Sequence, residues 1–444
     1  MNTISLDSVR RCLEGAVPAI VATCSADGTP NVAYASQVFY LDPRHVALSF
    51  QFFNKTRENI LANPQATVLV THPETVALYL LKLRYLRTEE SGPVFESMKA
   101  RLAGIASHTG MAGVFRLRGS DIYEVEAIER VPGPELPLSP RACDPLHAVR
   151  IISQQLAAQS DLAGLLDALL DGLGSHFGIQ HAMVLLVDAR RRQLFTIAST
   201  GYESSGAGSE IALGQGVIGV AAEQATPIRI NYLTQDLAYS RAVRAESVAE
   251  GLVEGLATEI PLPGLAESRS QLAVPIVVAG RVAGVLYAES PVDQRYGHED
   301  EDVLMTLAAQ LGMAIAVMQQ AEPHDEAAAA TAPPTLSGPA CTVRHYPGSD
   351  SVFLDEDYLI KGVAGAIFAK LARDFIDGGR TDFSNRELRL DLADKLPDIT
   401  DNLEARLILL QRRLADRAAC VQIEKTGRGR FRLTTSRPLR LLQC

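Results

Sequence analysis

The stretch "SFQFFNKTRENILANPQATVLV", residues 49–70, predicts a strand, a short helix and a second strand. Asn54 is a favourable N-cap residue, so the first helical turn would run from Lys55 to Arg57. The unpaired N–H groups and the positive end of the helix dipole favour acids there, whereas this turn carries two bases. A bound anion resolves the conflict, because backbone N–H groups with Lys and Arg form a phosphate site.

Strand-rich sequence surrounds this helix. The pair Asp27–Gly28 predicts a β-hairpin turn, and helices are expected only at 54–62 and 92–110. Several strands with two helical insertions indicate a small β-barrel. The first domain is therefore expected to cover residues 1–132, followed by a proline-rich linker at 133–143.

The length of 444 residues predicts about three domains. A hydrophobic fraction of 47% and a charged fraction of 21% are typical of soluble globular proteins, and no apolar run approaches the ~20 residues of a membrane span. We expect no membrane partner, no targeting signal and a cytoplasmic location. The six cysteines contain no CxxC pair and no histidine at metal spacing, which argues against zinc and against a disulfide framework. Reduced thiols are therefore expected.

Two further domains follow. Residues 144–320 begin with one long helical pattern at 144–178 and end with another at 298–320, with four strands between them, which indicates an α+β layer. The low-complexity segment 321–340 is expected to be a flexible linker. Residues 341–444 predict three helices and a basic hairpin, a winged helix-turn-helix pattern. These elements are expected at 354–379, 383–391, 400–416 and 421–435.

Charge is distributed unevenly along the chain. The net charge is −10, but residues 412–444 carry nine Lys or Arg against Asp416 and Glu424, which gives +7 there and −17 elsewhere. A basic tail on an acidic chain indicates a surface of a different kind, and phosphate groups of DNA are its expected partner.

The first domain resembles the flavin-binding split barrels that include pyridoxamine 5'-phosphate oxidases. The hairpin "DGTPNVAYASQVFY" and the stretch "FQFFNKTRENILANPQATVLV" carry the resemblance. The resemblance implies FMN as cofactor and a homodimer with the flavin at its interface. It implies that Lys55 and Thr56, with Asn54 and Arg57 nearby, hold the FMN phosphate. The other implied cofactor-binding residues, of which the first two would lie along the flavin ring, are Ser36, Gln37 and Gln51.

The sequence departs from the family pattern in two places, which affect the expected cofactor and the expected activity. The family usually has Ser or Thr followed by two consecutive bases, whereas this chain has Asn-Lys-Thr-Arg, which leaves haem or a deazaflavin as alternative cofactors. The domain also lacks the C-terminal Arg- and His-containing segment that grips pyridoxal substrates. We therefore expect no pyridoxamine 5'-phosphate oxidase activity, and catalytic residues are not assigned.

The second domain looks like a GAF domain. Its signs are the long terminal helices, "LGQGVIGVAAEQATPIRI" at 213–230 and "LAVPIVVAGRVAGVLYAES" at 272–290. The resemblance implies a pocket for an unknown small-molecule ligand, although many such domains bind none and only dimerise. The candidate pocket residues are Tyr202, Tyr232, Tyr239 and Arg241.

The third domain resembles the winged-helix effector domains of response regulators, with "DNLEARLILLQRRLAD" as the recognition helix and "VQIEKTGRGRFRLTT" as the wing. Its basic side chains would face phosphates and base edges. The candidate DNA-binding residues are Arg406, Arg412, Arg413, Lys425, Arg428, Arg430 and Arg432. Ile408 and Leu409 occupy positions where the family commonly has exposed bases, so a protein-interaction surface is a competing hypothesis.

The sequence thus predicts an α+β protein with a split β-barrel, a GAF α/β sandwich and a C-terminal winged helix-turn-helix. Three modules in sensor-to-output order indicate a flavin-binding sensor-regulator that acts on DNA. The alternatives are a flavin-dependent oxidoreductase with regulatory domains and a protein-interaction adaptor that uses the face of Ile408 and Leu409.

Overall fold

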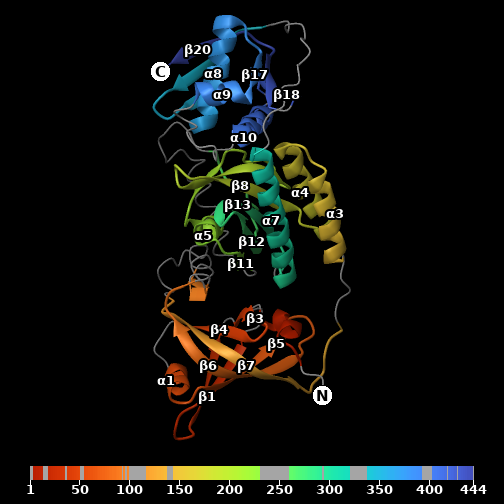
Figure 1. The fold of residues 1–444 in the computed structure, drawn as a ribbon, viewed down its shortest axis with the longest axis vertical. Helices are drawn as coiled ribbons and strands as arrows, with labels where there is room; N and C mark the ends of the chain where they lie inside the picture. The colour runs from red at the N-terminus through yellow and green to blue at the C-terminus, as the bar shows by residue number, and fades with distance from the viewer. Residues whose placement is uncertain are drawn as a thin grey trace.

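The computed structural model describes the chain in segments. They are residues 4–13, 19–35, 38–50, 55–92, 94–95, 98–99, 117–137, 144–230, 260–292, 295–320, 338–392, 403–417, 419–427 and 429–443. Three domains are stacked along the long axis, with the N-terminal domain at one end and the C-terminal domain at the other (Figure 1).

The N-terminal domain is built on a seven-stranded sheet of order β2-β1-β5-β6-β7-β4-β3. Its strands are β1 Ala19–Cys24, β2 Pro30–Ala35, β3 Val38–Asp42, β4 His45–Phe50, β5 Gln65–Thr71, β6 Leu78–Glu89 and β7 Gly119–Val131. Gly28 has a φ of 89°, the left-handed conformation that the predicted hairpin turn between β1 and β2 needs. Helix α1, Lys55–Ala62, and the 3-10 helix η1, Asp7–Leu13, pack side chains into this domain's core. Most of the helix expected at 92–110 lies outside the described residues.

The middle domain has a six-stranded antiparallel sheet of order β10-β9-β8-β13-β12-β11. Its strands are β8 His181–Asp188, β9 Gln193–Thr200, β10 Glu210–Ala212, β11 Ile228–Ile230, β12 Ser270–Val278 and β13 Arg281–Ser290. Its helices are α3 Pro145–Ala157, α4 Leu162–Phe177, α5 Gly216–Gln224 and α7 His298–Gln320.

The prediction of a single helix at 144–178 was wrong. The segment forms two helices, because α3 ends at the C-cap Ala158 and Asp161 starts α4 by accepting a 2.8 Å hydrogen bond from the Gly164 N–H. Both helices pack with α7. Among the described residues, α7 alone is long and apolar enough to cross a membrane by composition, but it packs on β12 as a helix of this domain's core.

The C-terminal domain contains two sheets, of order β16-β15-β14-β20 and β17-β19-β18. Its strands are β14 Cys341–Tyr346, β15 Ser351–Leu354, β16 Asp357–Ile360, β17 Asp382–Ser384, β18 Val421–Gly427, β19 Arg430–Thr435 and β20 Leu439–Gln443. Its helices are α8 Gly362–Gly378, α9 Asn385–Asp391 and α10 Leu403–Asp416.

The helix expected at 354–379 therefore starts too early. Residues 351–360 form the β15–β16 hairpin, and α8 begins only at Gly362. The basic hairpin predicted at 421–435 is present as β18 and β19, and Ser384 starts α9 with a capping box to Glu387, as expected of a Ser-x-x-Glu sequence.

Candidate functional site

The start of α1 presents one exposed amine. Lys55 Nζ lies 3.3 Å from Glu58 Oε2, and its side chain is 56% exposed. Glu58 supplies the acid that the first helical turn favours, so part of the expected charge conflict is relieved within the helix. An exposed pair of this kind contributes about 0–1 kcal/mol, so the amine remains available to an anionic ligand.

The side chains of the next two residues of α1 form hydrogen bonds with strands of the N-terminal sheet. The Thr56 hydroxyl accepts a 2.9 Å hydrogen bond from the Asn31 amide on β2. Arg57 Nη1 donates to Asp121 Oδ1 on β7 at 2.6 Å and to the Thr88 hydroxyl at 3.2 Å. Asp121 is buried, so Arg57 pairs with a carboxylate inside the N-terminal domain and ties α1 to β6 and β7.

The predicted FMN site is therefore described in part. Lys55 and Thr56 lie at the start of α1, which packs beside β1 and β2, whereas the guanidinium of Arg57 points to Asp121. Four predicted cofactor-binding residues lie outside the described residues, namely Ser36, Gln37, Gln51 and Asn54. The chemistry of an amine and a hydroxyl at a helix start suits a phosphate.

Helix α10, the predicted DNA-recognition helix, lies against the middle domain (Figure 1). A single cluster of buried apolar side chains runs from α4 and β9 of the middle domain into α10. Ile408 and Leu409, which the sequence left as a possible exposed face, are only 4% and 3% exposed. Leu409 lies next to Gly208 of the middle domain, since a Cβ on Gly208 would lie 3.6 Å from Leu409 Cδ1, an ordinary van der Waals distance.

A buried ion pair joins α10 to the end of β8. Arg406 Nη2 lies 2.9 Å from Asp188 Oδ2, and the two side chains are 8% and 10% exposed. The guanidinium carbon also lies 4.1 Å from the centre of the Phe195 ring on β9, a cation–π geometry. Asp188 accepts a second hydrogen bond, from the Arg191 N–H at 3.2 Å, so its position is fixed by its own domain.

Further ion pairs surround this contact. Arg412 pairs with Asp167 of α4 at 2.5 Å, and Lys361 pairs with Glu210 of β10 at 2.8 Å. Lys425 Nζ lies 2.9 Å from Asp161. Burial alone would raise the pKa of Asp161, but hydrogen bonds from the Gly164 N–H and from Lys425 lower its pKa. We call the whole contact, centred on Arg406 and Asp188, the docking face.

The predicted DNA-binding residues thus separate into groups. Arg406, Arg412 and Lys425 contact carboxylates of the middle domain. Arg413 donates to the Leu359 carbonyl at 2.9 Å inside its own domain, and burial lowers its pKa. Arg432 pairs with Asp382 on β17 at 2.7 Å. Arg430 begins β19, and Arg428 lies outside the described residues.

The expected ligand pocket of the middle domain is described only in part. A Cβ on Gly219 would lie 2.3 Å from the Ala212 carbonyl, so glycine is needed where α5 approaches β10. Tyr202 packs edge-on against His181, with ring centres 5.6 Å apart. Tyr232, Tyr239 and Arg241 lie outside the described residues. Within the described part of the chain, no group of three or more His, Cys, Asp or Glu is placed to hold a metal ion.

Two family models match the chain. The model of pyridoxamine 5'-phosphate oxidase matches residues 6–115, and the GAF domain model matches residues 159–316. The N-terminal domain is therefore pyridoxamine 5'-phosphate oxidase-like and the middle domain is a GAF domain, which confirms these two predictions. Neither match extends past residue 316. A search of curated proteins finds no match.

Solved structures are similar to separate parts of the chain. The GAF domain of an Acinetobacter phosphoenolpyruvate-protein phosphotransferase is 23% identical, with 40% of this chain and 97% of that chain covered and a TM-score of 0.32. An FMN-binding protein from Syntrophomonas wolfei is 13% identical, with coverages of 29% and 86% and a TM-score of 0.25. HupZ of Group A Streptococcus is 19% identical, with coverages of 30% and 100% and a TM-score of 0.24.

Proposed function

We propose that this protein is a cytoplasmic sensor-regulator in which the docking face controls a DNA-binding output. The barrel binds FMN, the GAF domain receives a small-molecule signal, and the C-terminal domain is a winged helix with α10 as its recognition helix. The observation that supports the proposal is the buried pair of Arg406 and Asp188, which holds α10 against the GAF domain.

The sheet of the GAF domain offers a path from ligand to output. Strands β8 and β9 place Met183, Leu185 and Leu194 in the apolar cluster beside α5, and the same strands carry Asp188 and Phe195 at the docking face. If a ligand binds more tightly when these strands are displaced, it also favours the displaced position of α10. The equilibrium shifts by the difference between the ligand's binding free energies for the two positions. The barrel adds an ion pair to this unit, between Arg10 and Asp302 of α7 at 2.6 Å.

The output is tested by DNA binding at several salt concentrations. Asp188→Ala removes the carboxylate that holds Arg406, so α10 is released and the basic residues meet phosphates. If the variant binds as a dimer with α10 free and contacts about eight phosphates, a plot of log binding constant against log salt concentration should have a slope near −7. The intact protein should bind weakly, with a shallow slope. Fluorescence anisotropy with a labelled 30-base-pair duplex of arbitrary sequence measures both.

Asp167→Ala is the matched control for that experiment. It changes the net charge by the same amount but removes only the exposed partner of Arg412, so a slope change of about one or less is expected. If Asp188→Ala binds duplex no better than the intact protein, the C-terminal domain is an interaction module within the chain and the DNA output is wrong.

The flavin assignment rests on the start of α1. Lys55→Ala should weaken FMN binding by about 1.5–3 kcal/mol, roughly 10- to 150-fold in Kd, because a charge-assisted hydrogen bond to the phosphate is lost. Titration of the apoprotein with FMN, followed by flavin fluorescence, measures the change. Glu58→Gln is the control, since it removes the acid beside Lys55 and should leave binding equal or tighter. Equal affinities of Lys55→Ala and the unchanged protein would reject this phosphate site.

A further inference from the structure

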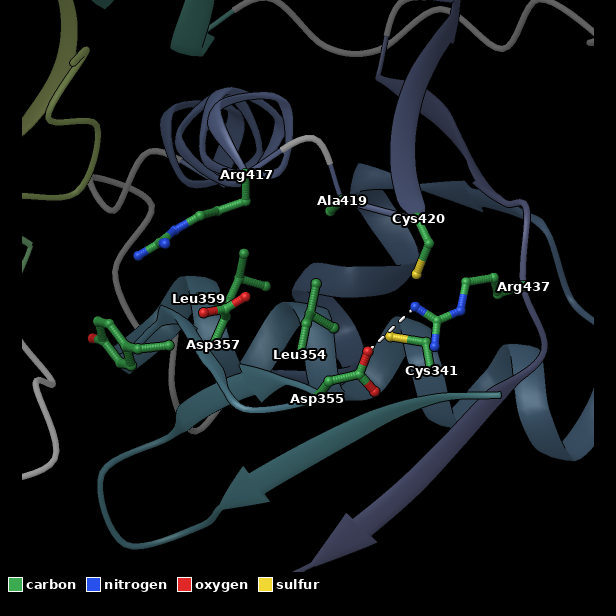
Figure 2. A pocket seen from close by; sticks show the side chains of 10 residues that line it. Cys341, Leu354, Asp355, Asp357, Leu359, Arg417, Ala419, Cys420 and Arg437 are labelled. Carbon is green, nitrogen blue, oxygen red and sulfur yellow. Dashed lines mark hydrogen bonds and ion pairs between the residues drawn. The ribbon is translucent and has the colours of Figure 1, made fainter. Parts of the chain in front are cut away.

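Two cysteines from distant parts of the C-terminal domain share one cavity. Cys341 is the first residue of β14, and Cys420 directly precedes β18. The cavity has a volume of about 160 Å³, and Asp355, Arg417 and Arg437 also line it. Figure 2 shows the two sulfur atoms directed into the same space beside the Arg437 guanidinium.

Backbone hydrogen bonds hold the two cysteines at the same short segment. The Ser436 N–H donates to the Cys420 carbonyl at 2.9 Å, and the Cys341 N–H donates to the Pro438 carbonyl at 2.7 Å. Both residues are thus anchored within three consecutive positions of the connection between β19 and β20. Disulfides require Cα atoms about 4.4–6.8 Å apart, and anchoring to one segment keeps such a pair in reach.

The surroundings assign different roles to the two thiols. Burial, and then a hydrogen bond with Cys420, raises the pKa of the Cys341 thiol to about 12, so Cys341 keeps its proton at neutral pH. Cys420 is only partly buried and is therefore the thiol that meets solvent. Arg437 is held beside both sulfurs because its Nε donates to the Pro339 carbonyl at 2.8 Å and its Nη1 to Asp355 at 3.3 Å.

We infer that Cys341 and Cys420 form a reversible dithiol–disulfide couple, in which Cys420 reacts first with a peroxide and Cys341 closes the disulfide. The other two described cysteines, Cys12 and Cys24, belong to the N-terminal domain. The inference concerns the C-terminal domain itself and holds whether or not that domain binds DNA.

The two steps balance. The Cys420 thiolate attacks one peroxide oxygen, the O–O bond breaks, and the departing hydroxide takes a proton from solvent and leaves as water. The Cys341 sulfur then attacks the sulfur of the Cys420 sulfenic acid, so that the S–S bond forms and the S–O bond breaks. The second hydroxide takes the proton of the Cys341 thiol and leaves as water. Two thiols and one hydrogen peroxide thus give one disulfide and two waters.

The disulfide would connect the two sheets of the domain. Cys341 belongs to the sheet β16-β15-β14-β20, and Cys420 leads into β18 of the sheet β17-β19-β18. Cys420 also follows the end of α10, where Asp416 accepts a hydrogen bond from Ser205 of the GAF domain. Oxidation therefore fixes the end of α10 to β14, and a higher Tm of the oxidised protein is expected because the cross-link restricts the unfolded chain.

Peptide mapping of the full chain tests the inference. The reduced protein is treated with hydrogen peroxide, remaining thiols are alkylated, and trypsin releases Cys420 in the peptide 418–425 and Cys341 in the peptide ending at Arg344. We expect these two peptides to be linked, with a mass loss of two hydrogens, and to separate on adding dithiothreitol. Cys24→Ser, a change in the barrel, should leave the linked peptide unaltered.

Two variants test the order of the steps. In Cys341→Ser the sulfenic acid of Cys420 has no partner, so dimedone should label Cys420. In Cys420→Ser the Cys341 thiol should stay reduced and unlabelled. The inference is overturned if both thiols of the unchanged protein are still alkylated in full after peroxide treatment, or if Cys420 is found linked to a cysteine other than Cys341. Both of these results come from the unchanged protein, so the test holds even if a variant fails to fold.

Discussion

Asp188→Ala is expected to lower the free energy of unfolding of the joined GAF and C-terminal domains by about 3–5 kcal/mol. The substitution leaves the Arg406 guanidinium buried without its carboxylate, and removal of one partner of a buried ion pair costs about that amount. Urea unfolding followed by circular dichroism measures the change as an earlier transition of these two domains.

Asp167→Ala provides the comparison for this result. Its partner Arg412 is 23% exposed and Asp167 itself is 60% exposed, so the loss should be about 1 kcal/mol or less. Similar small losses in both variants would mean that the docking face does not join the two domains.

Leu409→Asp is expected to cost about 3 kcal/mol or more. The change removes a 3% exposed apolar side chain from the contact with Gly208 and places a carboxylate in the same buried region as Asp188. Because the charge cannot be hydrated without separating the domains, limited proteolysis should cut the C-terminal domain faster than in the unchanged protein.

Leu390→Asp is the control for Leu409→Asp. Leu390 lies on α9 in the same domain and is 72% exposed, so its replacement should change stability by about 0.5 kcal/mol or less. Equal protease sensitivity of the two variants would contradict the placement of Leu409 at the docking face.

Turn residues and the spacing of apolar residues correctly predicted the elements that depend only on neighbouring residues. The Asp27–Gly28 turn lies between β1 and β2, and the four strands expected between the terminal helical segments of the GAF domain are present as β8, β9, β12 and β13. The helix break at Asp161 was missed because apolar residues continue at helical spacing across it, so only the cap distinguishes two helices from one. The β15–β16 hairpin was missed because a strand of four residues such as Asp357–Ile360 carries too short a pattern to differ from a helix start.

The sequence could not predict the docking face, because its partners lie far apart along the chain. Arg406 and Asp188 are 218 positions apart, and no period or motif connects them. Ile408 and Leu409 were the available signal, since two adjacent apolar residues on a helix expected to be basic indicate a covered surface. Their pattern does not reveal which surface covers them. The acidic partners Asp161, Asp167 and Asp188 cannot be distinguished by sequence from the other acidic residues of the chain. The same limit applies to Cys341 and Cys420, whose proximity arises from the segment 436–438.

A double-mutant cycle between Asp188 and Arg406 tests the central claim most directly. The free energies of unfolding of Asp188→Ala, Arg406→Met and the double variant are compared with that of the unchanged protein, and methionine keeps apolar contact with Phe195. The docking face predicts a coupling energy of about 2 kcal/mol or more, because the double variant no longer buries an unpaired charge. A coupling energy below about 0.5 kcal/mol, with both single effects additive, would contradict the claim that α10 is held on the GAF domain by this pair.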